Sequence, residues 1–153
     1  MATQLQHSPA RILSVALIAE TVVTAPTGDP AEDAAWPCHY AEEPDKPDDC
    51  VTIYDTVGKQ FGGNMHDGSL FAEQGFQVRV RANGHDRGWR KADELQQTLA
   101  RGLYLENLTI ESKTYVLYCV GDVSEVNVLG KEAPTSNRRL YTINGTLAIR
   151  ATN

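Results

Sequence analysis

The stretch Phe76-Gln-Val-Arg-Val-Arg-Ala82 alternates apolar and polar side chains along its whole length. Because successive side chains of a β-strand point to opposite faces of the sheet, this pattern predicts a strand with one apolar and one basic face. A helix is predicted to follow from about Asp86, with Gly102 as its C-cap. Its apolar positions, near helical spacing, are Trp89, Ala92, Leu95, Leu99 and Leu103.

Two regions upstream extend this strand–helix unit. Ser8-Pro9 predicts a helix start, since a hydroxyl N-cap followed by proline at the first helical position is favourable. Apolar residues from Ile12 to Ala19 cover most of that helix, so we expect it to bury a second side, in its own core or against another subunit. Cys50–Asp55 is predicted as a strand, and Gly58–Gly68 as a glycine-rich turn or an extended hairpin tip.

The last segment, Arg138–Thr152, allows two interpretations. Asn144-Gly145 is typical of a type I′ hairpin turn. However, apolar residues keep one parity straight through this pair, as a single continuous strand requires; they are Tyr141, Ile143, Leu147 and Ile149. We favour one long strand, with Gly145 at a bulge or at a close contact.

The order of elements predicts an α+β fold in a single domain spanning residues 1–153. A helix, a long loop and two or three strands come first, followed by a helix and three strands. Two of the last strands, Asn107–Ile110 and Thr114–Val120, are expected to form a hairpin. We predict a mixed, mostly antiparallel sheet with both helices packed on one face.

The net charge of −6 is concentrated in one segment. Asp29–Cys50 contains eight acidic residues and one base, Lys46, and so carries −7, whereas the rest of the chain carries +1. This segment belongs to a predicted acidic loop over residues 24–49, rich in proline, with one brief strand near Cys38. Loops of this length in compact domains are usually functional or disordered.

Basic residues gather on the alternating strand and the helix after it, where they include Arg79 and Arg81. One interpretation is a solvated sheet face. The main alternative is pairing with an acidic surface of a neighbouring copy, for which the acidic loop is a complementary partner. A nucleic-acid surface would need a larger basic excess and aromatic platforms.

No catalytic or cofactor motif is evident. The histidines and the three cysteines match no closed zinc motif, so we predict no metal, and free thiols. Asp48-Asp49 lies in a proline-rich loop with no evident aromatic pocket, which argues against acid–base catalysis there. No apolar run approaches the ~20 residues that span a bilayer, and no signal peptide is expected. We therefore predict a soluble, cytoplasmically made protein without a cofactor.

Three segments resemble tail terminator proteins of long-tailed bacteriophages, also called minor capsid or tail completion proteins. Val126–Glu132 resembles a strand that ends in a Leu-Gly-basic-acidic turn, and Arg138–Asn144 resembles the arginine and final aromatic-x-x-Asn strand after it. Pro47–Thr56 is similar to a segment in which Pro-Asp precedes a strand. The order of elements agrees over Ser8–Ala151.

The resemblance implies a non-enzymatic α+β virion protein at the head–tail junction, assembled in the host cytoplasm. It implies a hexameric ring that caps the tail tube and joins it to the head connector. Expected partners are further copies, the tail tube protein and a head connector or head-closure protein, with genomic DNA passing through the lumen without sequence-specific binding. Our candidate assembly residues are Asp45, Asp48, Asp49, Arg79, Arg81, Leu129, Lys131, Glu132, Arg138 and Arg139.

Other functions remain open at this point. The first alternative is another neck component, such as a head-closure or adaptor protein. A small binding module or an enzyme of unknown chemistry is the alternative from a different class.

Overall fold

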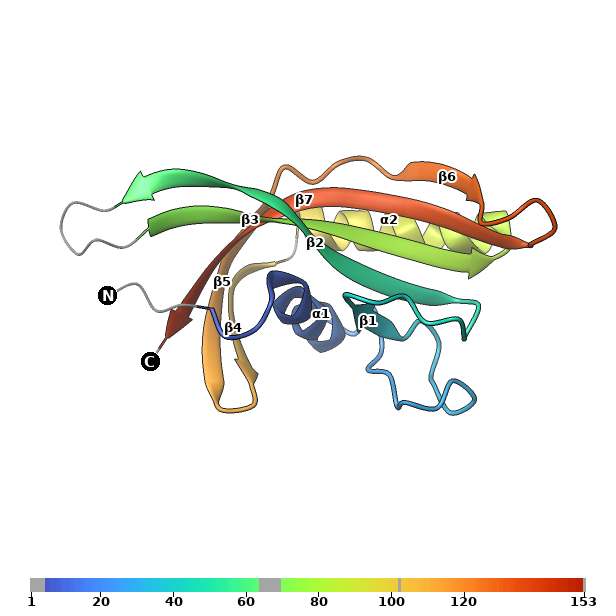
Figure 1. Cartoon of the computed structure of the whole chain (residues 1–153), viewed down its shortest axis with the longest axis horizontal. Coiled ribbons are helices and arrows are strands. Elements are labelled where there is room, and N and C mark those ends of the chain that lie inside the picture. The colour runs from blue at the N-terminus through green and yellow to red at the C-terminus, as the bar shows by residue number, and fades with distance from the viewer. Residues whose placement is uncertain (1–4, 64–69, 102, 153) are drawn as a thin grey trace.

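A computed structural model describes residues 5–63, 70–101 and 103–152 of the chain (Figure 1). Two helices, α1 (Pro9–Ala19) and α2 (His85–Arg101), accompany a seven-stranded sheet. Its strands are β1 (Cys38–Tyr40), β2 (Cys50–Gly63), β3 (Leu70–Asn83), β4 (Tyr104–Ile110), β5 (Lys113–Gly121), β6 (Asn127–Lys131) and β7 (Arg138–Thr152). The sheet order is β1-β2-β3-β7-β5-β4, with β6 pairing β7 outside this path. Among the described strands only β1 and β2 pair in parallel, so the predicted mixed, mostly antiparallel α+β fold is confirmed.

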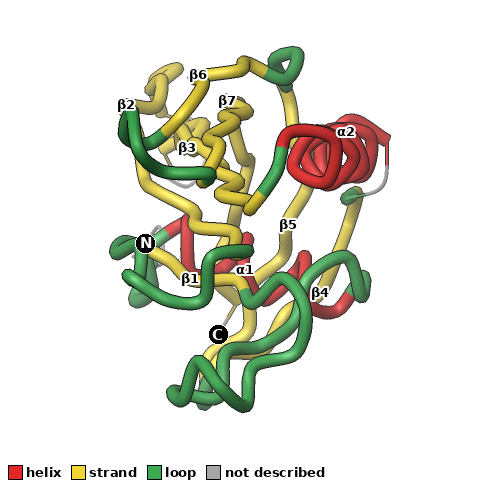
Figure 2. The backbone as a smooth tube through the Cα atoms, turned by 90° about the vertical axis from the view of Figure 1, so that its right-hand side faces the viewer, coloured by secondary structure: helices red, strands yellow, loops and turns green. Residues whose placement is uncertain are grey.

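Strand β7 connects the two halves of the sheet. Its register with β3 runs from Arg138 to Leu147, whereas its register with β5 begins at Thr146 and runs to Thr152. On the side away from β3, the first part of β7 pairs with β6 instead. The long strand therefore changes neighbours halfway, and the sheet curls around the helices (Figures 1 and 2).

Both helices pack against the same face of the sheet, as predicted. Val80 lies opposite Val51 on one side and opposite Tyr141 on the other, so the apolar positions of three strands share one face. On that face α2 approaches so closely at Gly88 that an added Cβ would lie 2.4 Å from the ring of Tyr141. The N–H of Ala10 in α1 donates to Asp55, which projects from the same side of β2. One continuous core results.

Helix α1 buries most of its second apolar side inside its own chain. Ser8 caps it by accepting a hydrogen bond from the N–H of Arg11 at 3.3 Å. The core-facing residues are Ala10, Ile12, Leu13, Ala16 and Leu17, all at most 1% exposed. Val15 and Ile18 are only partly buried. One side of the helix therefore still opens outward.

The sequence-based elements need three corrections. Four strands rather than three follow α2, because Asn127–Lys131 forms the separate strand β6. Trp89 is 42% exposed and does not join the core stripe of α2. The helix ends at Arg101, so buried Leu103 lies beyond it. The glycine-rich segment, in contrast, agrees with the extended hairpin among its two predicted forms, because strand β2 continues as far as Gly63. Its residues 64–68, like the expected C-cap Gly102, lie outside the described residues.

The single-strand interpretation of Arg138–Thr152 is confirmed. Gly145 lies inside β7, directly opposite Phe76 of β3. A Cβ built on Gly145 would lie 2.5 Å from the edge of the Phe76 ring. The glycine is therefore required by a close contact between ring and backbone, and not by a turn.

Gly145→Ala is expected to lower the free energy of unfolding by about 1–3 kcal/mol, because Phe76 must move within a packed core. Phe76→Leu removes the crowded ring atoms, so the double variant should lose less than the sum of the two single losses. Urea denaturation of the four proteins measures this coupling. Strict additivity would show that the contact between Gly145 and the ring does not carry the effect.

Candidate assembly surface

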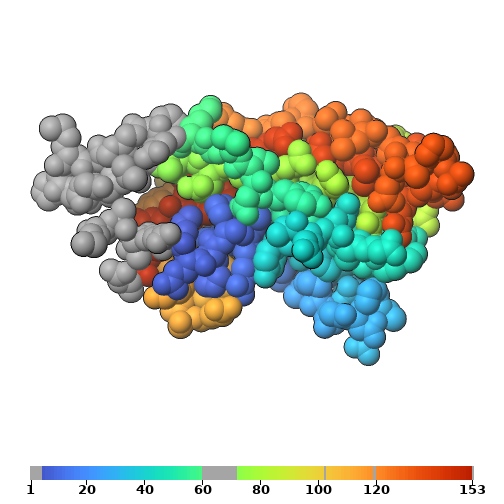
Figure 3. All heavy atoms as spheres, in the orientation of Figure 1, coloured from blue at the N-terminus to red at the C-terminus, as the bar shows by residue number. Residues whose placement is uncertain are grey.

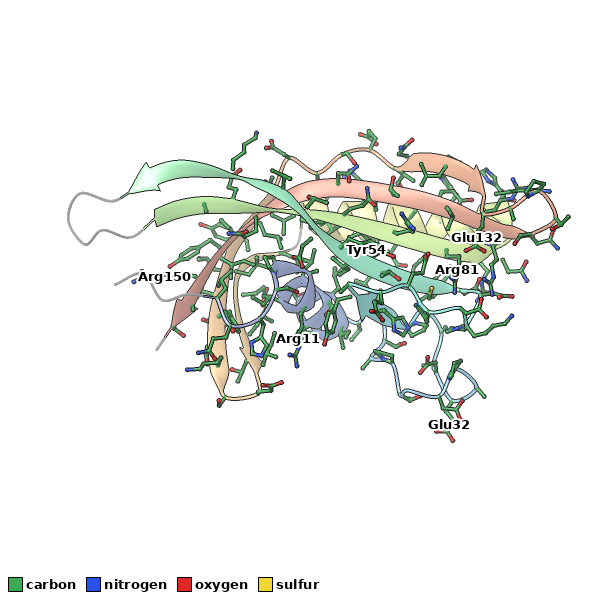
Figure 4. All side chains as sticks on the ribbon, viewed as in Figure 1. Arg11, Glu32, Tyr54, Arg81, Glu132 and Arg150 are labelled. Atoms are coloured by element: carbon green, nitrogen blue, oxygen red, sulfur yellow. The ribbon has the colours of Figure 1, made fainter. Side chains whose placement is uncertain are left out.

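The acidic loop folds back onto the basic face of the sheet in the same chain. Figure 4 shows Arg81 and Glu132 at one end of the molecule, where the loop, β3 and the β6–β7 connection meet. At this end, which we call the charged end, described ion pairs join four arginines to five carboxylates. These residues are Arg79, Arg81, Arg87, Arg138, Glu43, Asp45, Asp48, Asp49 and Glu132.

Arg81 of β3 binds the acidic loop through its buried guanidinium. It is only 2% exposed, and its guanidinium donates to the carbonyl oxygens of Pro44 at 2.6 Å and Pro47 at 2.7 Å. Longer bonds reach the carbonyls of Asp45 and Asp48, at 3.2 and 3.4 Å. A planar guanidinium with five N–H donors suits this task, because several loop carbonyls converge on one buried cation.

Arg138 of β7 binds the same loop through ion pairs and a hydrogen bond. Its guanidinium lies 2.8 Å from the Asp48 carboxylate, 3.4 Å from that of Asp45 and 3.3 Å from that of Glu132. It also donates to the carbonyl of Asp45 at 2.6 Å. The hydrogen bond from Arg138, followed by that from Lys46, holds the pKa of Asp48 below its ordinary value of 3.8. The ionised form of Asp48 is therefore the form that the fold stabilises.

Two further ion pairs complete the charged end. Arg79 pairs with Glu43 at 3.5 Å, and its guanidinium lies 5.1 Å from the centre of the Tyr54 ring. Arg87 of α2 pairs with Asp49 at 2.6 Å. The other carboxylate oxygen of Asp49 accepts the backbone N–H of Asn83 at 2.7 Å. The loop is thus bound to β3, to α2 and to β7.

Stability should fall in acid through this contact. The folded-state pKa of Asp48 is lowered, so its contribution is present above the unfolded-state pKa of about 3.9 and is lost as pH falls through the folded-state value. Asp48→Asn should be less stable near neutral pH, and its stability should change less between about pH 5 and pH 2. Urea denaturation across this range tests the prediction, with Glu32→Gln at the exposed loop tip as the control (Figure 4). An Asp48→Asn curve parallel to that of the parent would contradict it.

Seven of the ten candidate assembly residues therefore meet within one chain. The other three, Leu129, Lys131 and Arg139, lie on β6 and β7 and take part in none of those ion pairs. Leu129 is 49% exposed, and Lys131 is exposed and directly opposite Arg139 in the strand register. The structure gives neither base an ion-pair partner in the described part of the chain.

A groove that the sequence did not predict lies between α1 and the β1 region. It has a volume of about 670 Å³, and its lining includes Val15 and Ile18 of α1, Tyr40 at the end of β1, and Glu42 and Glu43 after it. The only sequence signal for it is the excess of apolar residues on α1. Figure 3 shows α1 and the β1 region side by side on the same face.

Exposed apolar side chains mark another surface that the sequence did not predict. Tyr104 and Leu105 of β4 are 69% and 50% exposed, and Tyr118 on the adjoining strand β5 is 38% exposed. The β6 side chains Val128 and Leu129 form a separate exposed apolar patch. Surface patches of this kind, rather than clefts, are typical of proteins that bind other proteins.

The described residues contain no cluster of three or more His, Cys, Asp or Glu side chains placed to hold a metal ion. Burial raises the pKa of the Cys38 thiol to about 12 and that of Cys50 to about 11. Both thiols are free and buried, so they stay protonated and unreactive at neutral pH. Among the described helices, none has the length and apolar character of a membrane span.

The comparison with protein families matches a bacteriophage family. The model of the bacteriophage tail terminator protein family matches residues 19–150, which is most of the chain. No curated protein matches the sequence. Tail terminators are structural, non-enzymatic components of the phage virion tail. The chain belongs to the bacteriophage tail terminator protein family.

Proposed function

We propose that copies of this chain form a ring, hexameric as the sequence resemblance implies, which caps the tail tube and joins it to the head connector. Such a subunit needs lateral contacts with its neighbours and axial contacts with the tube and the connector. Its function therefore depends on several unlike surfaces and on no reactive group.

One observation carries this proposal: large apolar side chains are exposed in two separate places at sheet edges. One place is β6, with Val128 and Leu129 about half exposed, and the other is the β4–β5 end with Tyr104, Leu105 and Tyr118. Figures 1 and 2 both show β6 and β4 on different sides of the protomer. A head-to-tail ring uses two different patches of each subunit, and unlike patches at separate edges meet that requirement.

The charged end of the structure supports passage of DNA past it without sequence-specific binding. Tight DNA binding requires arginines or lysines that are free to contact phosphates or base edges. Arg79, Arg81 and Arg138 are instead bound to carboxylates and carbonyls of their own chain. The basic strand therefore serves the fold of the loop, and we propose no DNA-reading role for it.

A capping assay tests this function. Purified tail tubes assembled without a terminator are mixed with the protein, and tube length and end structure are followed by electron microscopy. We expect elongation to stop and one end of each tube to carry a ring, with hexameric stoichiometry by quantitative mass spectrometry. Continued elongation with no protein bound at the tube ends would overturn the proposal.

A further inference from the structure

The β6 edge presents an apolar and basic surface, and no described residue of the same chain forms an ion pair with its bases. Of the strands that the structure describes, β6 pairs with β7 alone, and its register shifts between Val128 and Gly130, where Gly130 has a φ of 92°. Beside the exposed Val128 and Leu129, Lys131 lies directly across from Arg139. Like charges directly opposite each other on neighbouring strands are unfavourable, so an acid from outside the chain would stabilise this pair.

The α1–β1 groove is apolar and acidic, so it is complementary to the apolar and basic β6 edge. Its apolar lining includes Val15, Ile18 and Ile110, and Glu42 and Glu43 supply its acids. Glu42 is exposed and has no ion pair within the described residues, whereas Glu43 binds Arg79 through one oxygen while its buried Oε1 has no hydrogen-bond partner there.

The one arginine of the groove is already engaged by its own chain. Arg11 pairs with Glu111 at 2.9 Å and lies over the Tyr40 ring, with 5.7 Å between its guanidinium carbon and the ring centre. Among the described residues, therefore, no ion pair neutralises Glu42. An apolar segment that carries a base fits the groove both in shape and in charge.

These two surfaces lie on opposite sides of the protomer. In Figure 1 β6 runs along the upper edge and β1 lies lower, beside α1, and the perpendicular view of Figure 2 separates them in the same way. Two complementary surfaces on opposite sides of one chain join copies head to tail, and such contacts close into rings when the rotation between neighbours permits.

We propose that the β6 edge of one copy docks into the α1–β1 groove of the next copy. Leu129 would lie against Val15 and Ile18, and Lys131 would pair with Glu42. This inference rests on the proposed ring function and names the lateral contact within it. A second copy is the occupant that we favour because both halves of the complementary pair are present on the same chain. The β4–β5 patch then remains for an axial partner.

A charge swap tests this contact with the full-length protein. Glu42→Lys and Lys131→Glu are made singly and together, and the concentration for half-maximal ring formation is measured by mass photometry and on purified tail tubes. Each single variant places like charges in the contact and should raise that concentration at least about tenfold, the equivalent of about 1.4 kcal/mol. The double variant restores opposite charges and should return to within about threefold of the parent.

The matched controls are Glu32→Lys, Lys113→Glu and their combination, which change charge identically at exposed positions that line neither surface. Thermal denaturation checks that every variant folds. Single swaps that leave ring formation unchanged, or a double swap that fails to rescue it while the parent still caps tubes, would overturn this contact but not the ring. Loss of tube binding with intact free rings would assign the groove to the tube protein instead and overturn the second copy as occupant. A parent protein that neither forms rings nor caps tubes would overturn the function itself.

Discussion

Replacing Arg81 with alanine is expected to lower the free energy of unfolding by about 3–5 kcal/mol, among the largest effects of any single change in this protein. The substitution removes a buried cation that donates to the carbonyls of Pro44 and Pro47 and also contacts Glu132 at 3.8 Å. The loop carbonyls would lose their donors at a position shielded from water. The acids that the loop brings to the sheet would also lose a compensating charge.

Arg81→Lys separates charge from geometry. Lysine keeps the positive charge but offers one nitrogen where arginine offers a planar fork, so it should recover only part of the loss. Arg150→Ala is the control, because Arg150 is exposed at the opposite end of the molecule (Figure 4). Urea denaturation gives the stability, and hydrogen exchange over residues 41–49 reports whether the loop is released. Wild-type protection of these residues in Arg81→Ala would show that Arg81 does not hold the loop.

Leu17→Ala is expected to lower the free energy of unfolding by about 2–5 kcal/mol. Leu17 is fully buried in the core that α1 shares with the sheet. Because this core is closely packed, truncation loses apolar burial and leaves a cavity that the surrounding side chains fill only partly. Thermal or urea denaturation measures the loss.

Ile18→Ala provides the contrast on the same helix. Ile18 is only partly buried and lines the α1–β1 groove. Its truncation should lower the free energy of unfolding by less than about 1.5 kcal/mol, because Ile18 buries less apolar area within the monomer than Leu17 does. The same truncation should weaken ring formation, because Ile18 lines the groove. Equal stability losses for the two variants would show that the helix has no outward-facing side reserved for a partner.

Local patterns carried enough information to predict the core of the fold. The alternation of Phe76–Ala82 identifies β3 and its apolar face, and the constant parity through Gly145 identifies β7 as one strand. Both are properties of a few consecutive residues, because the period of side-chain orientation in a strand is two. The reason for Gly145 is not local, since the ring that excludes a side chain there comes from β3.

The partners of the acidic loop could not be predicted from the sequence. Charge segregation indicates that acids and bases attract one another, but it does not say whether they meet within one chain or between copies. In the structure, Asp48 and Arg138 meet although 90 positions separate them. The acceptors of Arg81 are backbone carbonyls, which every residue possesses and no side-chain pattern reveals.

The groove could not be predicted from the sequence for a related reason, and neither could the placement of the two bases at the β6 edge, although Leu129, Lys131 and Arg139 are candidate assembly residues. Val15 and Ile18 look like core residues, and only the placement of β1 and the following loop shows that they line a groove. Lys131 and Arg139 are separate candidate assembly residues in the sequence, and only the β6–β7 register places them opposite each other. Both surfaces therefore depend on how distant segments pack.

A cryo-electron microscopy reconstruction of the head-proximal end of tails assembled with this protein would show the ring and its lateral contact directly. We predict a single closed ring of this chain on the last ring of the tube, with β6 of each subunit in the α1–β1 groove of its neighbour. A tube end that carries no ring of this chain, or carries only isolated copies without lateral contacts, would contradict the account.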